Sequence, residues 1–436
     1  MAVTKQIINL NTEQIVIRKL NTRILIFFMI CYFVSILDRA NISVASLTMN
    51  EALHFSPAVY GFGAGIFFIG YFIFEVPSNI ILGKVGARVW IARIMFTWGI
   101  VTICMIFIQG IISFFSLRFL LGIAEAGFYP GVIYYLSLFY PRTHRTKAIG
   151  LFQIASPVSL MIGTPLVGLI LSLHGSLGLQ GWQLIFLLTG IPAALLGIIC
   201  FFYLKPSVSQ VHWLTTTEKS WLNDQIDAEK KARPLGELKF YQVFREPQVW
   251  LATFLLFAIN VGFNGAAFWI PQIIKSVGAQ SNLVASVLSG IPYFVAAVSV
   301  VVISRYSDKT GKRKVYIVSC LLASGAGFLL GVITGHIVLT IIALSIATAG
   351  LLSAMPPIWT YPIAMFSGVA AATAIATINS VGVLGGIVGP NIIGFITNKT
   401  GNPSAGLAVV SIVLFAGGIA SLFLRIPKRQ LIGKVQ

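Results

Sequence analysis

Charged residues are scarce in this sequence. Only 10% of its 436 residues are Asp, Glu, Lys or Arg, whereas 57% are hydrophobic. Soluble domains carry about 25% charged residues, because their surfaces face water. A soluble chain of this length would bury a large core but would lack the polar surface to cover it. The composition therefore excludes an ordinary soluble protein and favours one that lies in a membrane.

The sequence also lacks the patterns of an enzyme or of an ATP-driven pump. The hydrophobic segments contain no Glu-x-x-His pattern and no set of nucleophile, base and orienting acid. No phosphate-binding Gly-x-x-x-x-Gly-Lys-Ser/Thr loop occurs. The four cysteines have no metal-ligand spacing and are expected to be small apolar fillers. We therefore expect no catalytic residue, no metal and no cofactor.

What the sequence has instead is a series of hydrophobic blocks of about 20 residues, the length of helix that crosses about 30 Å of hydrocarbon. Backbone polar groups in lipid must bond within their own segment, so each block must form a helix. The sequence predicts an all-α integral membrane protein with twelve transmembrane helices. The predicted spans are 24–46, 58–82, 88–109, 112–137, 147–171, 183–204, 249–274, 282–304, 315–334, 336–362, 369–395 and 404–424.

The distribution of positive charge predicts the orientation. The formal net charge is +18, which the excess of Lys and Arg in cytoplasmic loops explains without a nucleic-acid partner. Only Lys275 and Lys399 fall in loops predicted to face outward. Arg39 and Arg118 lie within spans, and all other Lys and Arg residues are expected on the cytoplasmic side. We expect a multi-pass protein of a bacterial inner membrane with both termini in the cytoplasm.

The chain divides into two equal halves. A long polar stretch, 205–248, separates six spans from six and is expected to be a central cytoplasmic loop. The halves are 24–204 and 249–424, and the tails are 1–23 and 425–436. This arrangement suggests an internal repeat.

Two cytoplasmic turns carry the trace of that repeat. Lys84-Val85-Gly86-Ala87-Arg88 follows the second span, and Lys309-Thr310-Gly311-Lys312-Arg313 follows the eighth. In each turn a glycine permits the tight bend, and the cations favour the cytoplasmic side. We expect these turns to be gating loops. Their predicted gating residues are Lys84, Gly86, Arg88, Asp308, Lys309, Gly311 and Arg313.

Several stretches resemble the anion:cation symporter family of the major facilitator superfamily. They are Leu37-Asp38-Arg39-Ala40-Asn41-Ile42 in span 1, Glu75-Val76-Pro77-Ser78-Asn79 in span 2, Arg118-Phe119-Leu120-Leu121-Gly122-Ile123-Ala124-Glu125-Ala126-Gly127-Phe128 in span 4 and Pro357-Ile358-Trp359-Thr360-Tyr361-Pro362 in span 10. The resemblance covers nearly the whole chain and is greatest to bacterial permeases for tartrate, sugar acids and hydroxyphenylacetate. It implies two pseudo-symmetric six-helix bundles with a substrate cavity between them.

The resemblance also implies roles for particular residues. Arg39 is similar to the family's ligand for a substrate carboxylate. Asp38 and Glu125 are similar to its proton-coupling acids, and Arg118 is expected to pair with one of them. Trp359 and Asn379 match positions expected to line the cavity. The function implied is proton-coupled uptake of a small organic anion by a functional monomer, with the proton gradient as the energy source.

The charges themselves support a site, because an ionisable residue inside a span costs about 2.5–3.5 kcal/mol even on the lenient insertion scales. Arg118 and Glu125 are seven residues apart and share one helix face. An arginine holds a carboxylate with two hydrogen bonds. If a substrate carboxylate takes the arginine, the protein's own acid loses its counter-charge and gains a proton. The alternative is that these residues form permanent ion pairs that fix helix positions.

Polar groups elsewhere leave two interpretations open. Glu75, near the cytoplasmic end of span 2, either meets water and nearby cations or belongs to the site. Tyr71, one turn earlier, either packs or bonds a substrate. Gln153, Asn264 and Asn379 either line the cavity or form interhelical hydrogen bonds. The alternative functions are an anion exchanger or uniporter without proton coupling, and a sensor built on a transporter fold.

Overall fold

The computed structural model describes residues 12–231, 240–365 and 368–425. Within these ranges the chain is helical, without a strand, and twelve helices are long and apolar enough to cross a membrane. The predicted fold class and number of spans are confirmed.

The first six spans are the helix 12–52, which includes η1 (Asn21–Leu25) and α2 (Ile26–Ala52), then α3 (Pro57–Val85), α4 (Ala87–Cys104) extended by η2 (Met105–Phe107), α5 (Ile111–Glu125) with α6 (Phe128–Phe139), α7 (Arg142–Leu171) and α8 (Gly181–Tyr203). The last six are α11 (Pro247–Ser276), α12 (Asn282–Thr310), α13 (Arg313–Ile333), α14 (Ile337–Met365), α15 (Gly368–Gly382) with α16 (Gly385–Thr400), and η5 (Pro403–Gly406) with α17 (Leu407–Ser421).

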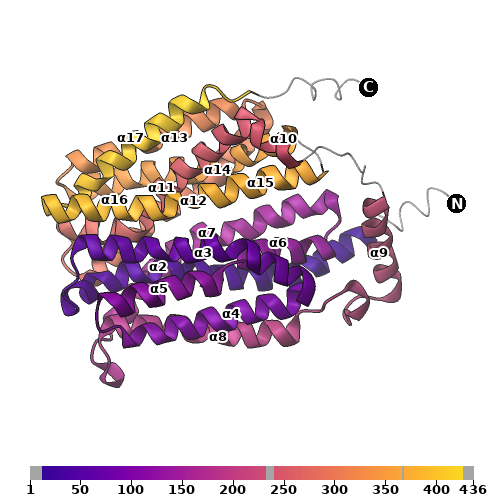
Figure 1. Ribbon diagram of the computed structural model, residues 1–436, viewed down its shortest axis with the longest axis horizontal. Coiled ribbons are helices and arrows are strands. Elements are labelled where there is room, and N and C mark those ends of the chain that lie inside the picture. The colour runs from indigo at the N-terminus through magenta and orange to yellow at the C-terminus, as the bar shows by residue number, and fades with distance from the viewer. Residues whose placement is uncertain (1–11, 232–239, 366–367, 426–436) are drawn as a thin grey trace.

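The helices form two layers that follow the two halves of the sequence. The first six spans make one layer and the last six the other, and α16 of the second half lies along α3 of the first (Figure 1). Both described chain ends lie at one end of the molecule, which we call the tail end. The other end carries the short loop between α2 and α3, and we call it the opposite end.

The first helix begins earlier than the sequence predicted. Helical structure starts at residue 12, inside the segment 1–23 that was expected to be a polar tail, while residues 1–11 lie outside the described ranges. The reason is an apolar stripe at helical spacing, formed by the buried Val16, Leu20 and Ile24. This stripe packs against the first half and extends the helix of span 1 beyond the hydrophobic block.

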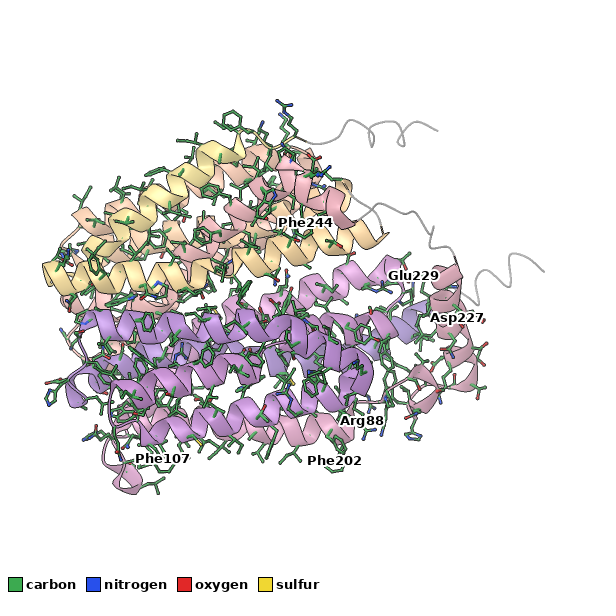
Figure 2. All side chains as sticks on the ribbon, in the orientation of Figure 1. Arg88, Phe107, Phe202, Asp227, Glu229 and Phe244 are labelled. Atoms are coloured by element: carbon green, nitrogen blue, oxygen red, sulfur yellow. The ribbon has the colours of Figure 1, made fainter. Side chains whose placement is uncertain are left out.

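Exposed apolar side chains cover the outer faces of the layers. Phe107 and Phe202 expose 67% and 68% of their surface, and Figure 2 shows both on the outer side of the first layer. In water such a surface would cause association, whereas in a bilayer it faces lipid. Inside the layers, glycines allow close approach of helices, as at Gly122, where a Cβ would lie 2.0 Å from the Phe67 carbonyl oxygen.

The fourth span is broken, although the sequence predicted one continuous helix over 112–137. α5 ends at Glu125, and α6 begins at Phe128. Gly127 between them has φ +88°, a conformation that favours glycine. Ser78 of α3 donates to the freed Ala126 carbonyl at 2.7 Å, and Trp90 donates to Ser78 at 2.9 Å. The break therefore puts Glu125 at a helix end in the middle of the layer.

The two layers meet tightly at the opposite end. A Cβ added to Gly61 would lie 2.6 Å from the Pro390 carbonyl oxygen and 3.0 Å from Gly394 Cα. Tyr60 donates to the Phe268 carbonyl at 2.7 Å, and the Gln272 amide donates to Ser46 at 2.7 Å. These contacts join α3 to α16, and α11 to α2 and α3. We call them the seam, and they close this end of the molecule.

The described part of the segment 205–248 contains the short 3-10 helix η4 (Val208–Gln210), the α-helices α9 (Thr216–Lys231) and α10 (Phe240–Arg245), and the start of α11, with 232–239 outside the described ranges. Lys19 binds both oxygens of Glu218 at 2.7 and 2.8 Å, and Arg145 binds both oxygens of Glu229 at 3.0 Å. These ion pairs hold α9 on the first half, whereas α10 packs on α15 of the second. Within the described ranges, the central segment therefore contacts both halves, the first through α9 and the second through α10. Of the predicted tail 425–436, only Arg425 is described.

Candidate functional site

Arg39 and Glu125 form an ion pair in the interior of the first half. Arg39 Nε lies 2.8 Å from Glu125 Oε1, which also accepts a hydrogen bond from Ser35 at 2.6 Å. Glu125 is 1% exposed, whereas the Arg39 side chain is 22% exposed. Glu125 Oε2 has no hydrogen-bond partner within the described ranges. Glu125 is thus a sequestered acid held by an arginine that remains accessible.

Aromatic rings form the other wall around Arg39. Its guanidinium carbon lies 5.1 Å from the ring centroid of Tyr71 and 5.3 Å from that of Phe67. Tyr71 itself is 4% exposed. Rings at this distance stabilise the cation while its remaining N–H groups stay available to an anion. The structure therefore brings the predicted residues Arg39, Tyr71 and Glu125 together.

Asp38 points away from that cluster, into the packing between α2, α4 and α8. One oxygen accepts from Thr102 at 2.6 Å, and the other accepts from Asn41 at 3.0 Å and from Thr189 at 3.3 Å. Asp38 is 1% exposed and forms no ion pair with any described residue. The groups that bond Asp38 are uncharged donors. They allow either a protonated Asp38 or an ionised Asp38 whose charge is stabilised by their hydrogen bonds.

Among the described residues Arg118 forms no ion pair, so the predicted pairing with Asp38 or Glu125 is not observed in this structure. Arg118 is fully buried and donates from Nε and Nη2 to the carbonyls of Gly63 and Ala64, at 3.1 and 3.0 Å. Its guanidinium also lies over the rings of Phe67, at 5.3 Å, and of Phe268, at 5.8 Å. Helix α3 packs so close to α5 that backbone carbonyls of α3, rather than an acid, accept the hydrogen bonds of the Arg118 guanidinium. Because Phe268 belongs to the second half, Arg118 is part of the seam.

Glu75 is buried in this structure and faces donors of the other half. It is 5% exposed, and its Oε1 accepts from Asn379 Nδ2 at 3.1 Å. Ser380 Oγ lies 3.5 Å from Oε2. Asn379 and Ser380 belong to α15 of the second half. The predicted cavity residue Asn379 therefore meets an acid of the first half.

For the remaining predicted binding residues, the described contacts are with groups other than Arg39. Gln153 donates to the Tyr129 hydroxyl at 2.6 Å. Asn264 donates to the backbone and side chain of Asn260 on its own helix, at 3.1 and 3.3 Å, so neither a cavity contact nor the alternative interhelical bond is observed. Trp359 packs beside a small apolar cluster near the tail end, which includes Val249 and Ala374.

The two turns bend as predicted. Gly86 and Gly311 have φ +93° and +68° and end α3 and α12. Lys84, Asp308 and Lys309 are exposed, and Arg313 begins α13. Arg88 donates to the Phe201 carbonyl at 2.7 Å and lies over that ring. No ion pair joins these turns within the described ranges, so their gating role stays a prediction.

Sequence reasoning missed several partners of the site. Ser35 lies four residues before Arg39, hence on the same helix face, and this spacing was a usable signal. Phe67 is likewise four residues before Tyr71. Thr102 and Thr189 come from other spans, and nothing in their local sequence indicates that they meet Asp38.

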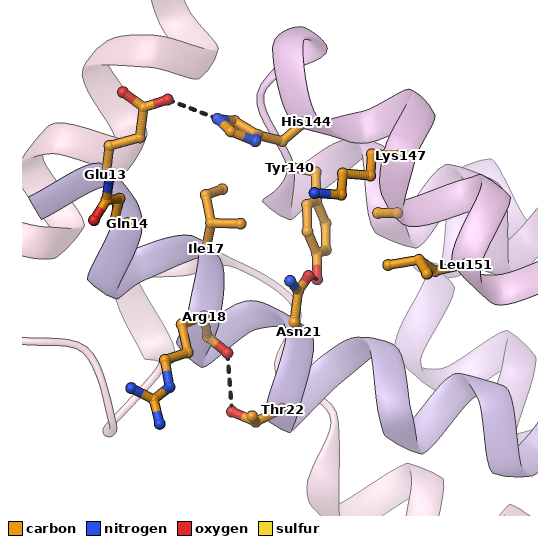
Figure 3. A pocket seen from close by; sticks show the side chains of 11 residues that line it. Glu13, Gln14, Ile17, Arg18, Asn21, Thr22, Tyr140, His144, Lys147 and Leu151 are labelled. Atoms are coloured by element: carbon orange, nitrogen blue, oxygen red, sulfur yellow. Dashed lines mark hydrogen bonds and ion pairs between the residues drawn. The ribbon is translucent and has the colours of Figure 1, made fainter. Parts of the chain in front are cut away.

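A separate pocket of about 460 Å³ lies at the tail end, between the first helix and the start of α7 (Figure 3). His144 Nε2 lies 2.6 Å from Glu13 at its edge, and Lys147 and Arg18 line it. It contains none of the predicted site residues. It is therefore not the substrate site predicted from the sequence.

Comparison with known proteins was made on sequence and on fold. The family model described as the Major Facilitator Superfamily matches residues 28–390 and 280–435. A protein of Agrobacterium vitis whose name assigns it to tartrate transport is 45% identical over 418 residues, which cover 95% of this chain and 96% of that protein. The quinolone resistance transporter of Acinetobacter baumannii is 40% identical, covering 93% of this chain and 94% of its own. The inner membrane transport protein RhmT of Escherichia coli is 33% identical, with coverage of 95% and 96%.

Two solved structures share the fold. A bacterial homologue of the human lysosomal transporter Spinster, in an inward-facing and occupied conformation, matches with a TM-score of 0.74 at 17% identity, covering 93% of this chain and 96% of that one. The xylose transporter XylE of E. coli, in a partially occluded inward-open conformation, matches with a TM-score of 0.73 at 15% identity, covering 92% and 96%. At such low identity the likeness concerns the fold alone.

Proposed function

This chain belongs to the Major Facilitator Superfamily and is a membrane transporter, and we propose that it imports a small organic carboxylate together with protons. One observation carries the proposal, namely the pair between the accessible Arg39 and the sequestered Glu125. The exposed part of Arg39 leaves N–H groups that can bind an incoming anion while Glu125 stays buried. Relatives named for tartrate transport support a carboxylate as the substrate.

The proposed coupling is an exchange of partners on Arg39. A substrate carboxylate takes the guanidinium in a two-pronged hydrogen-bonded grip. Glu125 then loses its counter-charge, and since it is 1% exposed it cannot recover stabilisation from water. It takes up a proton, and Ser35, 2.6 Å away, turns its hydroxyl to accept from the acid. Substrate and proton thus occupy the transporter together.

In this proposal the tail end faces the cytoplasm and the membrane is a bacterial inner membrane. The two halves rock about the central site, so that the seam opens when the tail end closes. One proton and one substrate carboxylate carry opposite charges, so their joint import is electroneutral and is driven by the pH gradient. Only protons in excess of the substrate's negative charges would draw on the membrane potential, at about 2.3 kcal/mol per net charge per 100 mV. No further cofactor is needed, and one chain holds the whole site.

Glu125→Gln tests the coupling. Glutamine imitates the protonated acid and removes a buried charge, so the protein should fold. In proteoliposomes, gradient-driven uptake should collapse, because the site can no longer release a proton, whereas exchange of labelled for unlabelled substrate should persist. Glu51→Gln, at the exposed end of α2, is the matched control and should retain both modes.

The other outcomes are informative. Gradient-driven accumulation in Glu125→Gln would place the coupling acid elsewhere, with Asp38 the next candidate. Loss of both modes in a folded protein would make Glu125 a binding residue only. Exchange without any gradient-driven uptake in the unmodified protein would support the anion exchanger instead.

A further inference from the structure

The loop between α7 and α8 holds a leucine in a strained backbone conformation. Leu177 has φ +57°, in the left-handed region that side chains other than those of Asn and Asp rarely adopt. Two glycines occupy the other left-handed positions of this loop, Gly175 with φ +87° and Gly178 with φ +70°. A glycine at 177 would remove the strain, yet the sequence has leucine there. Leu177 is 81% exposed, so packing against the described residues does not offset the strain.

The loop is directed toward the lipid. Figure 1 shows it hanging sideways from the first layer, beside the end of α8, rather than extending along the helix axes. Gln183 near the start of α8 donates to the Ile106 carbonyl at 2.9 Å, which joins this end of α8 to η2. Phe107 of η2 belongs to the lipid-facing surface, and Ile112 at the start of α5 is 84% exposed. The loop therefore continues an apolar surface that already faces the bilayer.

The composition and the hydrogen bonds of the loop suit an environment with little water. Residues 172–180 include no Asp, Glu, Lys or Arg, and Leu173 among them is half exposed. The N–H of Gly175 donates to the Leu179 carbonyl, and the N–H of Ser176 donates to the Leu173 carbonyl, both at 3.0 Å. Backbone groups that bond within their own segment can leave water at little cost.

The second half connects its matching helices with a shorter loop. Between the eleventh and twelfth spans only Gly401 and Asn402 separate α16 from η5, whereas residues 172–180 separate α7 from α8. A short turn is therefore sufficient to connect such helices. Connection alone does not account for the longer loop of the first half.

We propose that residues 172–180 form an interfacial anchor, in which the side chains of Leu173 and Leu177 enter the lipid leaflet at the opposite end of the molecule. The apolar surface that these leucines withdraw from water offsets the backbone strain at Leu177. The internal hydrogen bonds allow the loop to lie at the level of the lipid headgroups, where apolar side chains reach the acyl chains. The partner is the bilayer itself, whatever substrate the protein transports.

Fluorescence quenching tests the anchor on the full chain. Ser176→Cys carries an environment-sensitive fluorophore beside the intact leucine. The protein is placed in nanodiscs of phosphatidylethanolamine and phosphatidylglycerol, one chain in each, with part of the lipid carrying a nitroxide near the carbonyl end of an acyl chain. The nitroxide lipid should quench the fluorophore, and aqueous iodide should have little effect. A label on Gln280→Cys, exposed in a loop at the same end, should give the reverse.

Two further proteins complete the experiment. The unmodified protein, taken through the same labelling, measures the background from Cys104, which is partly exposed. Leu177→Asn separates the side chain from the backbone, because asparagine tolerates the left-handed conformation and retains the turn while the apolar group is lost. In that variant the label at position 176 should lose most of its quenching by nitroxide lipid and become accessible to iodide.

Three results would overturn the anchor. Quenching by iodide at position 176 equal to that at position 280 would place the loop in water. Protection from both quenchers would mean that protein, rather than lipid, covers the loop. Unchanged quenching in Leu177→Asn would show that the leucine does not hold the loop in the leaflet. The first two results come from protein that retains Leu177, so they decide the question even if Leu177→Asn does not fold.

Discussion

Replacing Gly61 by alanine should open the seam. A Cβ at Gly61 would lie 2.6 Å from the Pro390 carbonyl oxygen and 3.0 Å from Gly394 Cα, and both are backbone atoms that cannot rotate away. Overpacking of this kind costs about 1–3 kcal/mol. The cost applies only while α3 touches α16. The equilibrium between closed and open seams should therefore shift by about 5- to 150-fold toward the open state.

The helix itself gains from the substitution, and a control separates this gain. Alanine is favoured over glycine in a helix interior by about 1 kcal/mol, whichever way the halves are tilted. Gly83, also in α3, has no atom within 4 Å of an added Cβ. Gly83→Ala should leave the seam unchanged. Gly70→Ala, whose Cβ would meet the Phe119 carbonyl oxygen at 2.4 Å within the same half, should lower stability without opening the seam.

Distance measurement between spin labels provides the assay. Glu51 and Gln280 lie in exposed positions near the seam, on different halves. Labels on cysteines at these positions should show a longer-distance population in Gly61→Ala that is minor in the unmodified protein. An unchanged distance distribution in folded Gly61→Ala would refute the reasoning. So would an equal change in Gly83→Ala.

Three further predictions concern the anion site, the orientation and the central helix. Arg39→Lys keeps the charge but loses the planar fork, so the affinity for a carboxylate substrate should fall about tenfold or more, measured by thermal stabilisation; unchanged affinity would remove Arg39 from the site. A cysteine at the exposed Thr216 of α9 should resist an impermeant reagent in intact cells, and ready labelling would reverse the proposed orientation. Burial pulls the pKa of Glu218 upward, but hydrogen bonds from Lys19 and the Thr215 amide outweigh it and hold that pKa below its ordinary value. The contribution of the Lys19–Glu218 pair to the attachment of α9 should therefore be complete above the ordinary glutamate pKa of about 4.3 and be lost as the pH falls through the lower pKa of Glu218 in the folded protein. Hydrogen exchange of α9 should rise over that range, and Lys19→Ala should remove most of the pH dependence.

The N-terminal helix shows how far a local pattern can predict structure. Val16, Leu20 and Ile24 repeat every four residues and predict a buried helical stripe, although the segment around them is polar. Hydropathy averaged over a block misses such a stripe, because polar neighbours on the other faces dilute it. Ser35 and Arg39 share a helix face by the same rule. Residue spacing along a single helix is sufficient to predict both features.

The break in the fourth span was harder to predict from the sequence. Gly127 and Pro130 are common inside membrane helices, so their presence does not locate a break. The break persists because Ser78 from another span bonds the freed carbonyl of Ala126. Such compensation comes from tertiary contact and has no local signature.

The sequence by itself determined the membrane, the number of spans, the two halves and which few residues carry charge inside them. These follow from hydrophobic length and from the cost of burying charge, and both act along a single segment. Only the tertiary structure decided which groups these charged residues contact. Arg118 meets backbone carbonyls rather than an acid, and Glu75 meets Asn379, 304 residues away. The physical reason is that partners depend on how each helix is rotated and how the two halves are tilted, and an apolar helix face in lipid fixes neither.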